Sequence, residues 1–528
     1  MTSDGRKQDF EVSTDPEVQL ASSEVGRWRV LSNISRKVWG DDPRERKYVR
    51  KLDTFLFSYV LLGYFIKYLD QNNYSNAFVS GMQEELDLYG NERNLLNTYF
   101  NIGIILGTIP AQMIQLKYVR PSIWIPACEL GWSALTMIMA SAKNVETLYA
   151  LRFFIGLLES CSFPGFASIL GSWYGKSQLA KRMALFEQTA AIAGMFSGYL
   201  QAGLYTGMNG TAGLSGWRWL FIMDGVISIP IALYGFFALP DLPHNTRAFY
   251  LQKEADHDQQ DREYGMERIK AMGRKPPSKL TLKAIKEIYT SWQLWAFILP
   301  YLMVAEAGSG TGYFNLFLKS EGYSVVKTNI LPTIGNAIQI VAAFAMGWLS
   351  DATGSRVLTV MFVQAMVLVS NIILSIWNVP KAALFAAFYL SYTGGAAQPI
   401  VISYGHEITQ SNANLRQLLV ATGNIFTYTF SAWMPVMLFP TYDAPKYKYG
   451  YQILILFGGL AVAGMYLLDF LYKRDLKRNP QLYEVEQQSD YDQLTSERRR
   501  DDSLRPSRND FESRYGTVGH VDTSLRAK

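Results

Sequence analysis

Residues 152–165 read RFFIGLLESCSFPG, a mostly apolar stretch that carries two opposite charges. The run predicts a helix that lies in lipid, yet Arg152 is followed seven residues later by Glu159. Seven residues are almost two turns of α-helix, so both side chains project from nearly one face, about 10 Å apart along the axis. That separation is too long for a direct contact. We therefore expect each charge to meet a group from another helix or a ligand.

The rest of the chain repeats this apolar pattern. Only 18% of the 528 residues are charged, against about 25% in an ordinary soluble domain. The charges gather in the first 53 residues, near 241–289 and after 472. Roughly 20 apolar residues cross a bilayer as a helix. The sequence therefore predicts an all-α membrane protein with twelve transmembrane helices, at 54–78, 95–114, 122–141, 146–171, 182–205, 219–239, 290–316, 326–349, 357–377, 381–403, 417–439 and 450–472.

A polar stretch divides the predicted spans into six before it and six after it. It contains GRKPPSKL, whose paired prolines disfavour a continuous helix, so we interpret it as a linker. The predicted organisation is a cytoplasmic tail at 1–52, a first six-helix half at 53–240, a cytoplasmic linker at 241–289, a second six-helix half at 290–472 and a disordered cytoplasmic tail at 473–528.

Lys and Arg residues indicate how the spans are oriented. Nine of them lie at 27–51 and ten at 247–286, and basic loops tend to stay on the cytoplasmic side. We therefore expect a multi-pass protein with both termini in the cytoplasm, and we expect it in the plasma membrane.

Other ionisable residues also lie within the predicted spans. A charge at the bilayer centre costs at least about 2.5–3.5 kcal/mol, which makes each one a candidate for function. Asp70 lies in the stretch YFIKYLDQNN, and Lys67 lies one turn earlier on the same helix. Glu306 precedes three glycines at alternate positions, a pattern that interrupts helices at transporter sites.

The type of each side chain suggests whether it would bind an anion, carry a proton or contact a polar ligand. The planar guanidinium of Arg152 suits a substrate carboxylate, and a carboxyl group inside the membrane suits proton uptake and release near neutral pH. Asn424, in ATGNIFTYTF, is a candidate for a polar ligand contact. The competing interpretation is structural. In it the charges lock helices together, Lys67 reaches the interface, and the glycines after Glu306 and the amide of Asn424 serve helix packing.

Residues 347–356 read GWLSDATGSR and fall between two predicted spans of the second half. Gly347 and Gly354 allow a tight turn, and Asp351 can cap a helix or bond to a neighbour. With Arg356 at its end, we interpret this motif as a gating loop.

Twelve spans in a six-plus-six layout with this loop resemble the major facilitator superfamily, whose loop signature is G-x-x-x-D-x-x-G-x-R. The resemblance covers about residues 50–475. The equivalent loop of the first half, PAQMIQLKYVRPS, lacks the acidic residue, which argues against symmetric gating by the two loops. Four further segments resemble the anion:cation symporter family, and most closely its fungal branch of vitamin and organic-acid permeases, which includes pantothenate:proton symporters: LDQNNYSNAFVSGM, RFFIGLLESCSFPG, GSWYGKSQLAKR and GWRWLFIMDG.

This resemblance implies a role for each intramembrane charge. In that family an aspartate late in the first span and a glutamate late in the fourth carry protons, and they match Asp70 and Glu159. An arginine seven residues before the glutamate binds the anion, and it matches Arg152.

The resemblance also implies two substrate contacts, and at one position this chain departs from the family pattern. Tyr68 matches an aromatic contact and Asn424 a polar contact in the eleventh span. Bacterial sugar-acid members carry a second arginine directly after the aspartate, where this chain has Gln71. This difference implies a substrate that depends less on two cations, or one that uses Lys67 instead.

Together these observations predict a proton-coupled symporter that imports a small organic anion by alternating access, with pantothenate or a related vitamin or carboxylic acid as the best candidate. One rival is a proton antiporter that exports a metabolite or drug, but such antiporters usually carry a Gly-Pro element in the fifth span, and 182–205 contains no proline. The other is a non-transporting nutrient receptor on the same fold.

Signatures of catalysis do not emerge from the sequence. We see no triad elbow, metal cluster or phosphate loop, so we expect neither an enzyme nor a cofactor or metal. The expected partners are the organic anion, protons and the lipid bilayer, without nucleic acid, for a protein that acts as a monomer.

Overall fold

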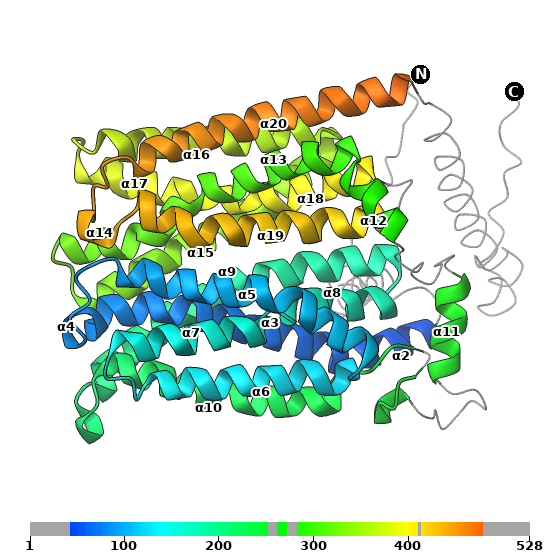
Figure 1. Ribbon diagram of the computed structural model, residues 1–528, viewed down its shortest axis with the longest axis horizontal. Coiled ribbons are helices and arrows are strands. Elements are labelled where there is room, and N and C mark those ends of the chain that lie inside the picture. Colours follow the sequence, from blue (N-terminus) through cyan, green and yellow to red (C-terminus); the bar gives the residue numbers. More distant parts are fainter. Residues whose placement is uncertain (1–42, 244, 252–260, 272–281, 410–412, 479–528) are drawn as a thin grey trace, which may run out of the picture.

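The computed structural model describes residues 43–243, 245–251, 261–271, 282–409 and 413–478. Every regular element within these ranges is a helix, which confirms the all-α fold class. The helices run side by side along the long axis of the molecule (Figure 1). Parts of the predicted tails and linker lie outside the described residues, at 1–42, 252–260, 272–281 and 479–528.

The first half contains six helical rods. The first rod extends from Pro43 to Glu85, includes two π-helical turns and is kinked at Ser80 and Gly81, where the backbone leaves helical geometry. It consists of α2 (Pro43–Leu52), η1 (Asp53–Phe57), α3 (Ser58–Ala77), η2 (Phe78–Met82) and α4 (Gln83–Glu85). The other rods are α5 (Glu92–Lys117), α6 (Pro121–Met139), α7 with α8 (Val145–Glu159 and Ser162–Trp173), α9 (Lys176–Met208) and α10 (Gly216–Ala238). A short 3-10 turn, η3 (Thr211–Gly213), separates the last two.

The second half also contains six rods. They are α13 with η5 and α14 (Trp292–Ala307, Ser309–Tyr313 and Phe314–Ser320), α15 (Val325–Thr353), α16 (Arg356–Ile376), α17 with η6 and α18 (Lys381–Ser391, Tyr392–Ala396 and Ala397–Ile408), α19 (Ala413–Leu438) and α20 (Gly450–Arg478), with η7 (Thr441–Asp443) before the last. Of the three glycines after Glu306, Gly308 separates α13 from η5, and Gly310 and Gly312 lie within η5, so the seventh rod is interrupted there, as expected.

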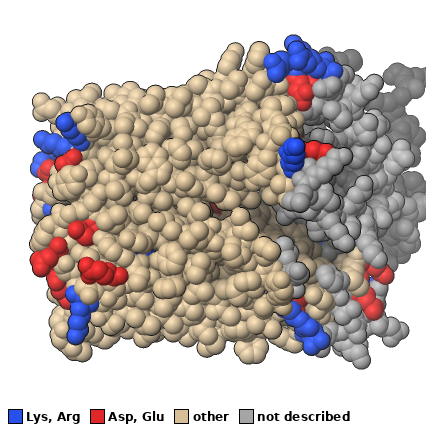
Figure 2. All heavy atoms as spheres, viewed as in Figure 1, with Lys and Arg blue, Asp and Glu red and all other residues tan. Residues whose placement is uncertain are grey.

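The surface of the bundle has the polarity of a membrane protein. On the face shown in Figure 2, Lys, Arg, Asp and Glu gather at the two ends, and the long middle zone shows almost none of them. Large apolar side chains are exposed along the helices, including Trp348, which is 73% exposed. Six helical stretches are long and apolar enough to cross a membrane: Pro43–Glu85, Val145–Trp173, Gly216–Ala238, Val325–Thr353, Arg356–Ile376 and Gly450–Arg478. The protein is therefore a multi-pass membrane protein.

The linker region joins the two halves, and its helix α11 is attached to the first half. It contributes η4 (Phe249–Leu251), α11 (Asp261–Ala271) and α12 (Leu282–Tyr289). Arg268 of α11 donates hydrogen bonds to the Glu45 carboxylate at 3.0 Å and to the Trp173 carbonyl at 3.0 Å. Tyr264 packs edge-on against Tyr48 of α2, with 5.3 Å between the ring centroids. These contacts hold α11 at the end of the bundle where α2 begins and α20 ends, which we call the terminal end (Figure 1).

The fourth rod breaks directly after Glu159. Pro164 has no N–H, so the helical hydrogen bond to the carbonyl of Ser160 cannot form. The chain passes through a turn at Ser160 and resumes as α8 at Ser162. Glu159 is consequently the last residue of α7, and Arg152 lies two turns earlier on the same helix.

A close crossing of α5 and α7 positions Arg152. A Cβ atom added to Gly156 would overlap the carbonyl oxygen of Phe100, and one added to Gly103 would overlap that of Phe153. Only glycine allows the two backbones to approach this closely. Gly156 follows Arg152 by one turn, so the crossing brings the guanidinium against the ring of Phe100.

Substituting Gly156 with alanine tests this crossing. The added methyl group meets backbone rather than a flexible side chain, so α5 and α7 must separate, and overpacking of this kind costs about 1–3 kcal/mol. We expect Gly156→Ala to lower the melting temperature of the purified protein in detergent. Gly203→Ala on α9 is the control, because its added Cβ atom meets nothing within 4 Å. Equal melting temperatures for the two variants would contradict the packing argument.

Candidate substrate site

A cavity of about 320 Å³ lies between the two halves. Its walls come from α3 and α5 of the first half and from α18 and α19 of the second. All of its lining side chains are aromatic or polar without charge: Tyr68, Gln71, Tyr74, Asn97, Phe100, Asn101, Gln398, Asn424, Thr427, Tyr428 and Ser431. The surface is hollowed between the halves toward the terminal end (Figure 2).

Arg152 lies directly behind this wall. Its guanidinium carbon is 4.3 Å from the ring centroid of Phe100 and 4.7 Å from that of Tyr74, and both rings line the cavity. Arg152 is only 2% exposed. Among the described residues, its Nε and Nη2 atoms have no hydrogen-bond partner. Buried polar groups are normally paired, so this guanidinium has donor capacity that the protein leaves unused.

Glu159 reaches the same wall through Gln71. The Gln71 amide donates a hydrogen bond of 2.9 Å to the Oε2 atom of Glu159, and Gln71 lines the cavity. Oε1 of Glu159 has no hydrogen-bond partner among the described residues. The two charges that the sequence analysis singled out are therefore both buried beside the cavity, where each meets side chains of other helices.

Lys67 occupies an aromatic corner of the site. Its Nζ atom lies 5.6 Å from the ring centroid of Tyr64 and 5.7 Å from that of Tyr68, close enough for cation–π attraction. It is also within hydrogen-bonding reach of Tyr428, across the boundary between the halves. Lys67 is 2% exposed, so it is buried rather than extended to an interface. Glu187 of α9, which the sequence analysis did not single out, lies within electrostatic reach of Lys67.

Asp70 has a partner that the sequence analysis also missed. Its carboxyl group is within hydrogen-bonding reach of the carboxyl group of Asp224 on α10, and both residues are buried. The Asn73 amide donates a 2.7 Å hydrogen bond to Asp224, and Ser197 of α9 donates one of 2.6 Å to Asn73. Two carboxyl groups this close share a proton more readily than both ionise.

The second half supplies the polar wall opposite. Asn424 lines the cavity and accepts a 2.7 Å hydrogen bond from the hydroxyl of Tyr301. Glu306 is buried one layer behind, where it accepts a 3.2 Å hydrogen bond from Ser431, another lining residue. The site thus brings together Tyr68 and Asn424 at the surface of the cavity. The ionisable side chains lie around it.

The GWLSDATGSR motif lies at the terminal end, away from the cavity. Gly354 ends α15 with a φ of 62°, which confirms the turn expected there. The expectation for Gly347 was wrong, because α15 continues to Thr353 and encloses this residue. Asp351 forms an ion pair with Arg356, whose Nε atom also bonds to Glu407 of α18 at 2.9 Å.

The halves are joined at the end of the bundle opposite the terminal end, which we call the far end. The Arg93 guanidinium donates hydrogen bonds of 2.7 Å to Ser75 of its own half and to the Gly312 carbonyl of the second half. Asn94 donates to the Phe439 carbonyl at 2.6 Å. The cavity is consequently covered at the far end.

Among the described residues, no group of three His, Cys, Asp or Glu side chains is placed to hold a metal ion. The chemistry available at the site is therefore that of carboxyl groups, a guanidinium, an ammonium group and uncharged polar side chains.

A profile of the Major Facilitator Superfamily matches residues 60–416 of the chain. The chain belongs to this superfamily. It is 42% identical over 417 residues to the MFS transporter PfmaC of Pestalotiopsis fici, with 78% of this chain and 77% of that protein covered. It is 33% identical over 490 residues to the pantothenate transporter liz1 of Schizosaccharomyces pombe, with 92% and 93% covered. The pantothenate transporter FEN2 of Saccharomyces cerevisiae is 31% identical, with 78% and 81% covered.

Solved transporter structures superpose on this chain and support the same fold. A D-xylose–proton symporter superposes with a TM-score of 0.54 at 14% identity and covers 79% of this transporter and 97% of its own chain. A bacterial homologue of Spinster, inward-facing and unoccupied, gives 0.55 at 16% identity, with 79% and 98% covered. The protein is a membrane transporter of the major facilitator fold, related to fungal permeases, and not an enzyme.

The Arg356 cluster generates a prediction about this transporter. Both partners of the Arg356–Glu407 pair are partly open, with side chains 23% and 39% exposed, so the pair stabilises the fold by at most about 1 kcal/mol. We expect Arg356→Glu to slow transport several-fold with little change in melting temperature, because it breaks the contact between α16 and α18 at the terminal end of the second half. Combining it with Glu407→Arg restores the pair and should recover most of the rate. A double variant as slow as the single one would exclude a role for the pair.

Proposed function

We propose that this transporter is a proton-coupled symporter that imports a small organic anion across the plasma membrane, with pantothenate or a related vitamin acid as the best candidate. In this proposal both termini are cytoplasmic, so the covered far end faces the outside. The observation that carries it is the buried Arg152, whose unpaired nitrogens lie behind the cavity wall. A buried cation whose hydrogen-bond donors are only partly paired is costly, and a bound anion would accept the remaining hydrogen bonds.

The lining of the cavity supports a substrate of this kind. Pantothenate carries a carboxylate, an amide and two hydroxyl groups. The carboxamides and hydroxyls of the wall can pair with the amide and the hydroxyls, and the guanidinium fork of Arg152 suits the carboxylate. Cavities that hold small molecules begin at about 300 Å³, which the observed volume exceeds slightly. Two relatives are named pantothenate transporters, which further supports this class of substrate.

The rings of Tyr74 and Phe100 separate Arg152 from the cavity. An anion must therefore displace at least one ring to reach the guanidinium. This displacement excludes water from the ion pair, and an ion pair in a drier site is stronger. Because Tyr74 belongs to α3 and Phe100 to α5, substrate binding would alter how the helices of the first half pack at the centre of the membrane.

Carboxyl groups beside Arg152 provide the proton sites. With Glu159 protonated, Arg152 is free to hold the anion. After the site opens to the cytoplasm and Glu159 loses its proton, the carboxylate competes for Arg152 and expels the anion. The Asp70–Asp224 pair is the second proton site in this scheme, since the two groups share a proton between them.

The net charge carried across the membrane in each transport cycle determines which gradient drives uptake. One proton per monovalent anion makes the step electrically neutral, so only the pH gradient contributes. A second proton adds one positive charge, and each elementary charge moved through 100 mV contributes about 2.3 kcal/mol. Two separate proton sites, at Glu159 and at the Asp70–Asp224 pair, favour the second arrangement.

Replacing Arg152 tests the anion site. Arg152→Met keeps a long side chain between the two rings but removes the charge, so we expect the melting temperature to stay the same or rise. Uptake of radiolabelled pantothenate into proteoliposomes with an imposed pH gradient should fall at least about 100-fold, as expected when a buried charge pair with the substrate is lost. Uptake by Arg152→Met at the wild-type rate would refute the anion site.

Replacing Glu159 tests proton coupling separately. We expect Glu159→Gln to abolish pH-driven accumulation of labelled pantothenate while exchange of internal for external pantothenate continues, because exchange needs no net proton movement. Glu129→Gln is a matched control, since Glu129 is equally buried in the same half but bonds to Tyr59, away from the cavity. Accumulation by Glu159→Gln driven by the pH gradient would reject the carrier role.

A further inference from the structure

A second pocket lies at the terminal end, outside the substrate site. It has a volume of about 560 Å³ and is lined by residues from the start of the first rod: Pro43, Arg46, Lys47, Arg50, Lys51, Thr54 and Phe55. Four of these seven residues are cationic. Nothing in the transport cycle proposed above uses them.

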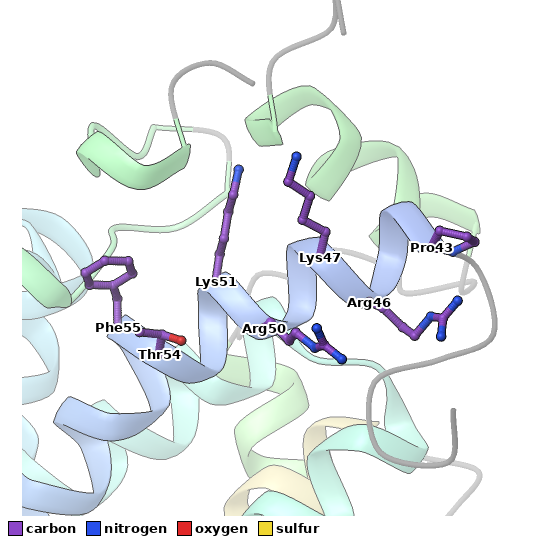
Figure 3. Close-up of a pocket in the computed structure, with 7 residues that line it drawn as sticks. All are labelled: Pro43, Arg46, Lys47, Arg50, Lys51, Thr54 and Phe55. Atoms are coloured by element: carbon purple, nitrogen blue, oxygen red, sulfur yellow. The ribbon is translucent and has the colours of Figure 1, made fainter. Parts of the chain in front are cut away.

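The spacing of the four cations produces two adjacent rows. Arg46 and Arg50 are four residues apart on α2, as are Lys47 and Lys51, so each pair occupies one stripe of the helix. Figure 3 shows Lys47 and Lys51 extending side by side in one direction and Arg46 and Arg50 on an adjacent face. The remaining face, with Tyr48, is buried against the protein.

Acidic residues of the same stretch are held by arginines elsewhere. Glu45 accepts hydrogen bonds from Arg268 of α11, and Asp53 accepts them from Arg182 of α9 at 2.5 and 2.7 Å. Neither carboxylate is among the residues that line the pocket. Its seven lining residues include four cations and no acid.

Immediately beyond the cations the surface becomes apolar. Phe55 lies four residues after Lys51, which is about 6 Å along the helix. It stacks on Tyr250 with 4.4 Å between ring centroids and meets Phe249 edge-on, and Phe249 is 60% exposed. A cationic pocket followed at once by exposed aromatic rings matches the boundary between phosphate headgroups and acyl chains.

From this juxtaposition we infer that the α2 pocket is a binding site for a polyanionic phospholipid headgroup, of the phosphorylated inositol lipid class. The four cations hold the phosphates, and the Phe55–Phe249 surface contacts the first carbons of the acyl chains. Basic clusters next to a transmembrane helix attract anionic lipids of the cytoplasmic leaflet, which is the side where the proposed orientation places α2. Lipid binding there is independent of whether the substrate proposal is correct.

Lipid titration of the full-length protein in detergent tests this site without depending on membrane orientation. The melting temperature is followed by intrinsic fluorescence while short-chain phosphatidylinositol phosphate is added, with phosphatidylcholine and phosphatidylserine in parallel. We expect the phosphorylated inositol lipid to raise the melting temperature in a saturable way, because a ligand that binds the folded state stabilises it. The variant with Arg46, Lys47, Arg50 and Lys51 all replaced by Gln should lose roughly tenfold or more in apparent affinity.

A second set of cations on the chain provides the matched control. Lys473, Arg474, Lys477 and Arg478 have the same helical spacing on α20, at the same end of the bundle, but Lys473 is ion-paired with Asp469 and none of them lines this pocket. Their replacement by Gln removes the same charge and should leave lipid affinity unchanged. If both variants lost the same lipid affinity, the effect would come from the overall positive charge of the protein, and the site would be overturned.

Two further titrations distinguish binding of a lipid from binding of a free phosphate compound. Inorganic phosphate and a soluble inositol phosphate are titrated in place of the lipid. We expect neither to match the lipid, because they lack the acyl chains that the aromatic surface contacts. A soluble inositol phosphate that matches the lipid would overturn the assignment to a lipid. No saturable response to the phosphorylated inositol lipid would overturn the site itself.

Discussion

Burying a guanidinium inside a membrane protein costs desolvation free energy, and the surrounding side chains must offset that cost. Arg152 lies between the rings of Tyr74 and Phe100, and two of its nitrogens have no partner among the described residues. The stacked rings compensate only part of the desolvation, since cation–π contacts contribute about 2 kcal/mol when desolvated. The crossing at Gly103 and Gly156 keeps the rings in place. The first half thus stores an unsatisfied charge at the wall of the cavity.

The two halves are arranged so that the cavity beside Arg152 is closed at one end and open at the other. Arg93 and Asn94 join them at the far end, while the hollow between them opens toward the terminal end (Figure 2). Ionisable groups surround the cavity without entering it, and its lining is uncharged. In the mechanism proposed above, a substrate would meet polar side chains first and charges only after the rings move. Substrate recognition and proton exchange would then be separated by one layer of side chains.

Apolar runs and misplaced charges carried most of what could be predicted. They predicted the all-α membrane fold, which the structure confirms, and they singled out Arg152, Glu159, Asp70 and Lys67 as candidates, because a charge within an apolar run is conspicuous in the sequence. The partners of these residues were less accessible. Asp224 and Glu187 meet Asp70 and Lys67 only through the packing of separate helices. The error at Gly347 arose because the sequence analysis began the loop at this residue, inside the span predicted at 326–349, whereas α15 continues to Thr353.

Attachment of α11 to the first half has a mechanical consequence. Through Arg268 and Tyr264 this helix is bound to α2 and to the end of α8, so it travels with the first half as one body. At the other end of the linker, the Tyr289 hydroxyl at the end of α12 lies 3.2 Å from the Thr422 hydroxyl of α19, in the second half. Eleven residue steps separate Ala271 from Leu282, and eleven steps of fully extended chain reach at most about 40 Å. The length of the linker therefore sets an upper limit on how far the two halves can separate at the terminal end.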